Sequence, residues 1–271
     1  MNEIWTDHFS HSQLVSVEEC PYAYYLLKAA GIKPVENAFA QAGILAHQLL
    51  EGWAKGEIAI RDLPVLWAQR FNQAVTAEFP HYLAVKGYAS KLYESILTYF
   101  QRFDGFPDHV IVGAEQKFQS AIAGERFVGI ADLILRNKNT GKLVIVDFKS
   151  CSLSSFKKNK VQMYRQLLLY SKHCADTFGE FPEKLRFELI KENTYDECPF
   201  DREDFVAARL WAETVINDIK SKDIPAWFEV RPEFFRCTNL CNCRNECIYG
   251  KPENHKRKGD TIETRRNLTV A

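Results

Sequence analysis

A change of hydrophobic pattern before the middle of the chain is the feature that most constrains how these 271 residues can fold. Residues 62–103 repeat apolar side chains at helical spacing, with a break near Pro80. The segments that follow are instead rich in valine and isoleucine, as strands are: residues 109–118, 127–135 and 142–149. Asn139, Thr140 and Gly141 form a turn between the last two segments, which predicts a β-hairpin.

Helices are predicted on both sides of these strands. Ser10 and Gln13 fit a helix capping pair, Pro21 fits the first position of a second helix, and residues 40–55 form a third. Later segments are a helix over 158–178, a strand over 185–191 and a helix over 201–220. This order predicts an α/β (α+β) core with a central mixed sheet flanked by helices. We expect four segments: N-terminal helices (1–60), a helical insertion (61–106), the main core (107–225) and a cysteine-rich C-terminal tail (226–271).

The composition is that of an ordinary globular protein, with 46% apolar and 26% charged residues. No apolar run is long enough to span a bilayer, and the first residues do not resemble a signal peptide. We therefore expect a soluble cytoplasmic protein with no membrane partner. The formal net charge is zero, whereas nucleic-acid-binding proteins are often basic. Lysines gather at Lys157, Lys158 and Lys160, although a solvated surface run is the simpler interpretation.

Acidic and basic side chains interrupt the predicted hairpin at corresponding places. Asp147 and Lys149 lie two apart on the third strand and so share a face, while Asp132 lies on the preceding strand. One interpretation is a satisfied ion pair at a strand end. The other is a site for a hard divalent cation such as Mg²⁺, with Asp132, Asp147 and the carbonyl of Phe148 as ligands. Lys149 would then orient the attacking water.

Phosphodiester hydrolysis explains why these residue types would be combined. A divalent cation lowers the pKa of a bound water and relieves charge on the phosphate oxygens. An Asp-x-Lys triplet alone is common and carries little information. Its weight comes from Gly129-x-x-Asp132 one strand earlier and from Gln166-x-x-x-Tyr170 on the next helix.

Together these motifs resemble the RecB-like branch of the PD-(D/E)XK nucleases, which have a restriction-endonuclease-like core. The segment from Gly43 to Glu51 resembles the branch's helix with a metal-binding histidine, and Cys20-Pro21-Tyr22 resembles its N-terminal signature. The resemblance implies catalytic roles for Asp132, Asp147, Lys149, Gln166 and Tyr170. It implies metal ligation by His47, Glu115, Asp132, Asp147 and Phe148.

Simpler interpretations exist for several of these residues taken singly. His47 on an apolar helix is by itself more often a packed histidine. Glu115 by itself is a solvated strand residue. Gln166 and Tyr170 are by themselves neighbours on a helix surface. Only the combination of motifs favours a site.

Four of the eight cysteines crowd near the C-terminus, which in a cytosolic protein indicates metal rather than disulfides. The pattern resembles the iron–sulfur subset of the branch, which includes AddB and the CRISPR-adaptation exonucleases. That resemblance implies a 4Fe–4S cluster held by Cys20, Cys237, Cys241 and Cys247. The usual spacing there is C-x2-C-x5-C. Here Cys241 and Cys247 are separated by five residues, but Cys237 and Cys241 are separated by three instead of two, so Cys243 could replace Cys241. The rival is a zinc ion held by the four C-terminal cysteines.

The sequence thus predicts a DNA nuclease that uses Mg²⁺ or Mn²⁺, an exonuclease on single strands or duplex ends. An alternative is a catalytically silent DNA-end binder or assembly subunit. A nuclease acting on RNA is another. Protein partners would belong to a recombination and repair, phage replication or CRISPR complex.

Overall fold

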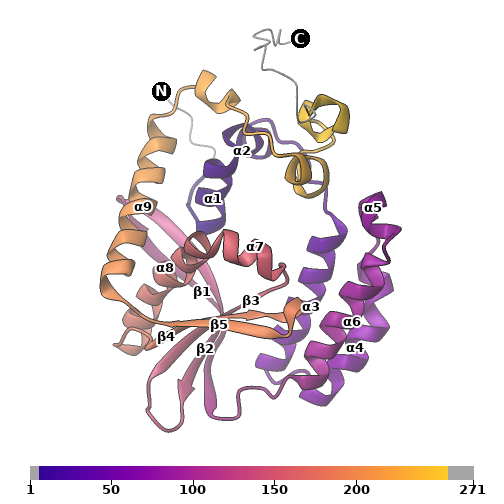
Figure 1. Cartoon of the computed structure of the whole chain (residues 1–271). Coiled ribbons are helices and arrows are strands. Elements are labelled where there is room, and N and C mark those ends of the chain that lie inside the picture. Colours follow the sequence, from indigo (N-terminus) through magenta and orange to yellow (C-terminus); the bar gives the residue numbers. More distant parts are fainter. Residues whose placement is uncertain (1–5, 256–271) are drawn as a thin grey trace.

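Five strands form one mixed sheet in the computed structural model, which describes residues 6–255 (Figure 1). The strands follow chain order across the sheet: β1 (His109–Ile122), β2 (Glu125–Asn137), β3 (Leu143–Lys149), β4 (Lys184–Leu189) and β5 (Thr194–Pro199). Only the β3–β4 pair is parallel. The predicted mixed sheet flanked by helices is confirmed. The ends of the predicted first and last segments, residues 1–5 and 256–271, lie outside the described residues.

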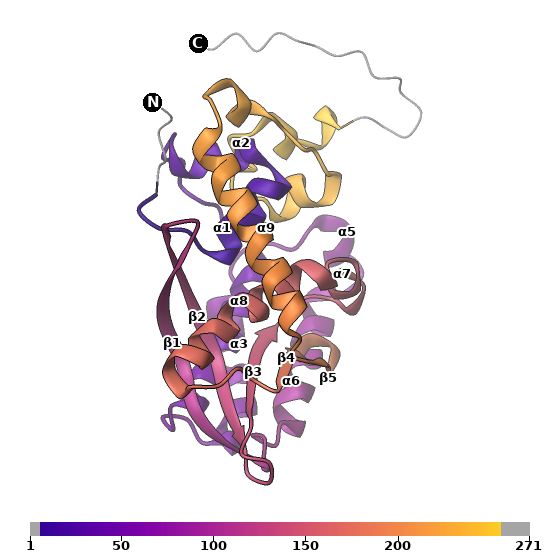
Figure 2. The same ribbon diagram turned by 90° about the vertical axis from the view of Figure 1, so that its left-hand side faces the viewer.

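Helices cover both faces of the sheet (Figures 1 and 2). One face packs on α1 (His11–Glu19), α8 (Lys160–Phe178) and α9 (Arg202–Ser221). The other face packs on α3 (Ala38–Ala54), α4 (Leu63–Ala74) and α6 (Tyr88–Arg102), and the four-residue α5 (His81–Ala84) lies between the last two along the chain. Buried Phe187 and Phe148 point to opposite faces, which gives each helical layer its own core. No helix among residues 6–255 is long and apolar enough to cross a membrane.

Local capping explains several helix boundaries. The side chain of Ser10 accepts a hydrogen bond from the amide of Gln13 and begins α1, as predicted. Pro21 occupies the first turn of α2 (Pro21–Lys28). The predicted helix over 158–178 is wrong at its start, because α7 (Leu153–Lys158) precedes α8 and Asn159 separates the two. The side chain of Ser152 caps α7.

The β1–β2 ribbon is longer than predicted and reaches past the end of β3. β1 has 14 residues, and its pairing with β2 extends to Ile122 and Glu125. Where β3 no longer covers the edge of β2, the chain before α1 takes its place. Phe9 pairs with Phe127 through backbone hydrogen bonds of 2.8 Å to Arg126 and Val128. An isolated β-bridge therefore joins the N-terminal segment to the sheet.

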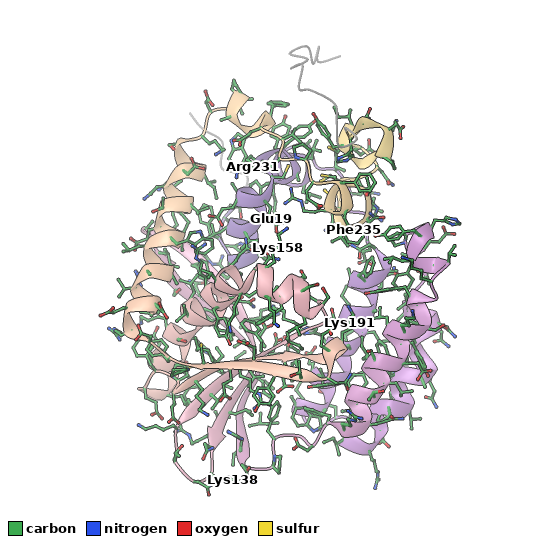
Figure 3. All side chains as sticks on the ribbon, viewed as in Figure 1. Glu19, Lys138, Lys158, Lys191, Arg231 and Phe235 are labelled. Carbon is green, nitrogen blue, oxygen red and sulfur yellow. The ribbon has the colours of Figure 1, made fainter. Side chains whose placement is uncertain are left out.

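The cysteine-rich segment consists of short helical turns that pack on α1 and α2. The turns are Pro225–Phe228, Arg236–Leu240, Ile248–Gly250 and Pro252–Asn254. Arg236 donates a hydrogen bond to the carbonyl of Glu19, and Asn37 donates one to the carbonyl of Leu240. This segment, α1, α2 and α7 line a half-open cavity of about 1070 Å³, and Figure 3 shows the labelled Glu19, Lys158 and Phe235 around an open region there. We call it the cysteine-lined cavity.

Candidate active site

The hairpin of β2 and β3 brings two carboxylates together. Leu133 pairs with Val146, so Asp132 lies opposite Asp147 one step further along the two strands. The Asp147 side chain is buried, and Asp132 accepts a hydrogen bond of 2.9 Å from the amide of Phe148. The neighbouring placement expected from the sequence is present in the structure.

Asp147, Lys149 and Gln166 form a closed set of contacts. The Lys149 ammonium lies 2.7 Å from Oδ2 of Asp147 and donates a hydrogen bond of 3.0 Å to Oε1 of Gln166. Nε2 of Gln166 donates to Oδ1 of Asp147 at 2.7 Å. Burial opposes the charged form of Lys149, but the adjacent Asp147 carboxylate outweighs it and raises the lysine pKa. The lysine therefore stays charged and fixed in direction.

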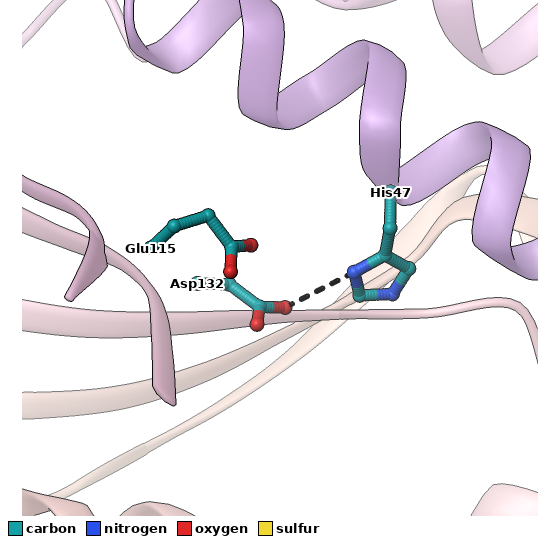
Figure 4. Close-up of side chains that lie close together, drawn as sticks. All are labelled: His47, Glu115 and Asp132. Carbon is teal, nitrogen blue, oxygen red and sulfur yellow. Dashed lines mark ion pairs between the residues drawn. The ribbon is translucent and has the colours of Figure 1, made fainter. Parts of the chain in front are cut away.

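His47, Glu115 and Asp132 form a candidate metal site. Their ligand atoms all lie within 4.8 Å of one another, and Nδ1 of His47 is 3.5 Å from Oδ2 of Asp132 (Figure 4). Burial lowers the pKa of His47, which favours the neutral imidazole that binds metals. Asp147 is not a member of this set of three, and it interacts with Lys149 and Gln166 instead.

The charges in this site fit a divalent cation. Burial raises the pKa of Asp132 well above its usual value, and the charge of Asp147 adds to the effect. The pKa of Glu115 is raised by burial and then by nearby Glu51. Neighbouring buried carboxylates resist ionising together, and a bound cation would relieve that repulsion. Two carboxylates and one imidazole are a suitable ligand set for Mg²⁺ or Mn²⁺.

Two glycines of the sequence motifs allow close approach within the site. A Cβ atom on Gly43 would lie 2.7 Å from Oγ of Ser150, so glycine lets α3 carry His47 against the end of β3. A Cβ atom on Gly129 would lie 2.4 Å from the Phe118 ring and 2.7 Å from the Tyr170 ring. Glycine at this position therefore allows the buried Tyr170 to lie against β2.

Glu115 reaches the site through an unusual backbone. Ala114 pairs with Leu133 and Gln116 pairs with Ala131, so Glu115 lies opposite Asp132. Its φ is 48°, in the left-handed region that a residue with a long side chain rarely adopts. Strain of this kind is often found where a side chain must be aimed at a site. Neither the backbone strain at Glu115 nor the close approach of Ser150 to Gly43 could be predicted from the sequence.

His11, which was not predicted from the sequence, is buried near the site. Nε2 of His11 donates to the carbonyl of Gln162 at 3.0 Å, one helical turn before Gln166. The ring also lies 5.7 Å from that of Trp211. Burial lowers the pKa of His11 to about 4, so this histidine is neutral and supports α8. Its only sequence signal is its position between Ser10 and Gln13, the predicted helix capping pair.

Five cysteines line the cysteine-lined cavity: Cys20, Cys237, Cys241, Cys243 and Cys247. The adjacent Cys243 lowers the pKa of Cys241, while the Cys243 thiol donates to the carbonyl of Ala23 at 3.4 Å. Four thiolates around one zinc ion would lie about 3.8 Å apart. Among the described residues, no three cysteine sulfurs approach within 4.8 Å of one another. Cys20 lies at the same cavity as the four C-terminal cysteines.

Comparisons with known proteins bear on the family and the fold. A family model described as "PD-(D/E)XK nuclease superfamily" matches residues 8–248. A crystal structure from Eubacterium rectale, of a protein named "Putative exonuclease", has a TM-score of 0.51 and 14% identity, with 89% of each chain covered. The structure of SSO0001 has a TM-score of 0.37 and 17% identity, over 89% of this chain and 86% of its own. Among curated proteins, none matches at a significant level.

Proposed function

Since the chain belongs to the PD-(D/E)XK nuclease superfamily, we propose that it is a metal-dependent deoxyribonuclease. The observation that supports this most is the convergence of His47, Glu115 and Asp132 beside the Asp147–Lys149 ion pair. Mg²⁺ or Mn²⁺ would be held by the first three, with Asp147 and the carbonyl of Phe148 available as further ligands.

The chain's own residues would have distinct parts in hydrolysis. A bound cation supplies a Lewis acid and lowers the pKa of a coordinated water. Lys149, fixed by Asp147 and Gln166, would orient that water and balance negative charge on the phosphate. Tyr170 lies one turn after Gln166 and would support the strand near the scissile bond. Its hydroxyl stays protonated, because burial raises its pKa further above the usual value.

The cysteine-lined cavity supports an exonuclease that acts on a free single strand. Ser152 and Gln162 line it, and they lie close in sequence to Lys149 and Gln166 respectively. The cysteine-rich segment covers the cavity on the side opposite α7 (Figure 3). A strand that occupies it would lie between this segment and α7, which favours single-stranded DNA or an opened duplex end as substrate.

A 4Fe–4S cluster held by Cys20, Cys237, Cys241 and Cys247 is part of the proposal, with Cys243 as the alternative to Cys241. Cys20 lines the same cavity as the C-terminal cysteines, which favours a ligand set that includes it over a zinc ion held by the four C-terminal cysteines alone. Anaerobically purified protein should be brown and contain iron and sulfide. Cys20→Ser should lose iron, whereas Cys151→Ser, outside the cavity, should retain it. Colourless protein with stoichiometric zinc would support the rival.

The central test is cleavage of end-labelled DNA with Mn²⁺. Asp147→Ala and Lys149→Ala should each lower the rate by roughly a hundredfold or more, as expected for groups that act on the nucleophile. Lys138→Ala, in the exposed β2–β3 turn, is the control and should retain the wild-type rate. Cleavage that survives both active-site changes would overturn the proposal. Competition with RNA of the same sequence distinguishes a ribonuclease.

A wild-type protein that binds DNA ends without cleaving them would indicate the silent alternative. Partners in a recombination and repair, phage replication or CRISPR complex remain a prediction. A pull-down with the cluster-containing protein would identify them.

A further inference from the structure

A second pocket, of about 600 Å³, adjoins the candidate active site, and of its lining residues the mechanism above uses Tyr170 alone. The β1–β2 ribbon, the start of α1 and Tyr170 line it. We call it the ribbon pocket. Its lining includes the charged Lys117 and Arg126 and the exposed, apolar Ile130.

One stripe of α8 connects both cavities with the candidate active site. Gln162 lines the cysteine-lined cavity, Gln166 binds Asp147, and Tyr170 lines the ribbon pocket. These residues are four apart, so they lie on the same helix face about 6 Å from one another along the axis. Asp147 therefore lies beside the middle of a helix face whose two ends line the two cavities.

The sequence positions of the residues that line the ribbon pocket also place it next to the metal ligands. Lys117 lies two residues beyond Glu115 on β1, and Ile130 lies two residues before Asp132 on β2. Lys117 and Ile130 are directly paired in the ribbon. A ligand in the ribbon pocket would thus be next to whatever occupies the metal site.

The chemistry of the ribbon pocket suits a single strand of nucleic acid. Nε of Arg126 donates to Gln119 at 2.9 Å, which directs the guanidinium along the ribbon. Asp7, 3.5 Å from Arg126, is an exposed carboxylate that faces this group, and Glu115 faces Lys117. A cation bound at Glu115 would remove the second of these opposing charges. Ile130 is 42% exposed and offers an apolar surface for a base.

We propose that the ribbon pocket binds the nucleic-acid strand on the far side of the scissile phosphate from the cysteine-lined cavity. Phosphates would contact Lys117 and Arg126, and a base would lie against Ile130. The proposal rests on the nuclease function, and it adds a second strand-binding site that makes the path continuous across the metal centre.

The test compares Lys117→Gln/Arg126→Gln with the matched control Arg61→Gln/Lys138→Gln, whose residues line neither cavity. Binding of fluorescein-labelled oligothymidines of 4 to about 20 nucleotides is measured without added divalent ion, across a salt series. The ribbon-pocket variant should bind the longer strands on the order of tenfold more weakly near 0.1 M salt. Its slope of log K against log salt should fall by about 1.4, as for the loss of two phosphate contacts. Ile130→Glu should weaken binding similarly.

Several outcomes separate this inference from the function it rests on. Equal affinity and equal salt slope in the ribbon-pocket and control variants would overturn the inference, with or without nuclease activity. Hydrolysis of bis(p-nitrophenyl) phosphate by the wild-type protein with Mn²⁺ tests the nuclease function separately, because that substrate is too small to span two cavities. Thermal unfolding of each variant confirms that changes in binding are not due to loss of fold.

Discussion

At the scale of single residues, Glu115 shows why part of the site could not be predicted. Its type and its strand position are visible in the sequence, but its positive φ is not. Left-handed backbone at a residue with a side chain costs about 1–3 kcal/mol, so the surrounding ribbon must impose it. The strained residue is also the one that completes the group with His47 and Asp132.

Two substitutions of Glu115 should distinguish the effect of its strained backbone on stability from the effect of its carboxylate on metal binding. Glu115→Ala and Glu115→Gly both remove the carboxylate, so both should bind Mn²⁺ more weakly and to the same extent. Glycine tolerates the left-handed backbone, so Glu115→Gly should be about 1 kcal/mol more stable than Glu115→Ala. Urea unfolding without metal gives the stability, and calorimetric titration gives the affinity. Equal stability of the two variants would show that the backbone relaxes.

His11 should make the stability of the fold depend on pH. Its pKa falls from 6.5 to about 4 in the folded protein because the ring is buried, so the unfolded chain binds this proton more tightly. The stabilisation is complete above about pH 6.5 and is lost as the pH falls toward 4, a change on the order of 3 kcal/mol. His11→Phe keeps a ring beside Trp211 and cannot titrate.

The measurement for His11 is urea unfolding between pH 4.5 and 7.5. The variant should be less stable than wild type at pH 7, because the carbonyl of Gln162 loses its donor. Its stability should decline less steeply below pH 6.5. Parallel pH profiles for the two proteins would contradict the assignment, and the comparison cancels every other group that titrates in this range.

At the scale of secondary structure, periodicity predicted the elements with strong patterns and missed those set by tertiary contacts. The hairpin of β2 and β3 follows from alternation and a turn, and it places Asp132 opposite Asp147. β5 was not predicted, because its half-exposed residues have no clear alternation and it exists by pairing with β4. Similarly, the pairing of Phe9 with β2 depends on where β3 ends.

Gly129 provides a test of how tightly β2 and α8 must pack. Gly129→Ala would place a methyl group inside contact distance of Phe118 and Tyr170, both buried, so it should destabilise the fold by about 1–3 kcal/mol. Phe118→Leu removes the nearest ring atoms and should restore part of that loss in the double variant. Thermal unfolding of the four proteins of this cycle measures the coupling. Additive effects would show that the packing adjusts in another way.

At the scale of the whole molecule, the locations of the charged side chains matter more than the net charge. The net charge of zero says little about where cations lie. The lysine run seen in the sequence divides in the structure, since Lys160 forms an ion pair with Asp196 while Lys158 lines the cysteine-lined cavity. Both lysines are exposed, as the surface interpretation expects, but their neighbours differ. Only the fold distinguishes them.

Closure of the chain around the cysteine-lined cavity leads to the last prediction. Arg244 of the cysteine-rich segment donates to the carbonyls of Val35 and Glu36, and Arg236 donates to Glu19. A cluster that includes Cys20 would close this side further. A strand without an end could then enter only if these contacts opened.

Circular single-stranded DNA should therefore be cleaved roughly a hundredfold more slowly than the same circle cut once, by exclusion of the strand from the productive geometry. The matched linear substrate has identical sequence and charge, so only the free end differs. Cys20→Ser should lower the ratio of the rate on linear DNA to the rate on circular DNA, because it removes a proposed cluster ligand that links the cysteine-rich segment to the start of α2. Equal rates on circle and line in the wild-type protein would show that the strand reaches the metal site from the side and that the cavity does not enclose it.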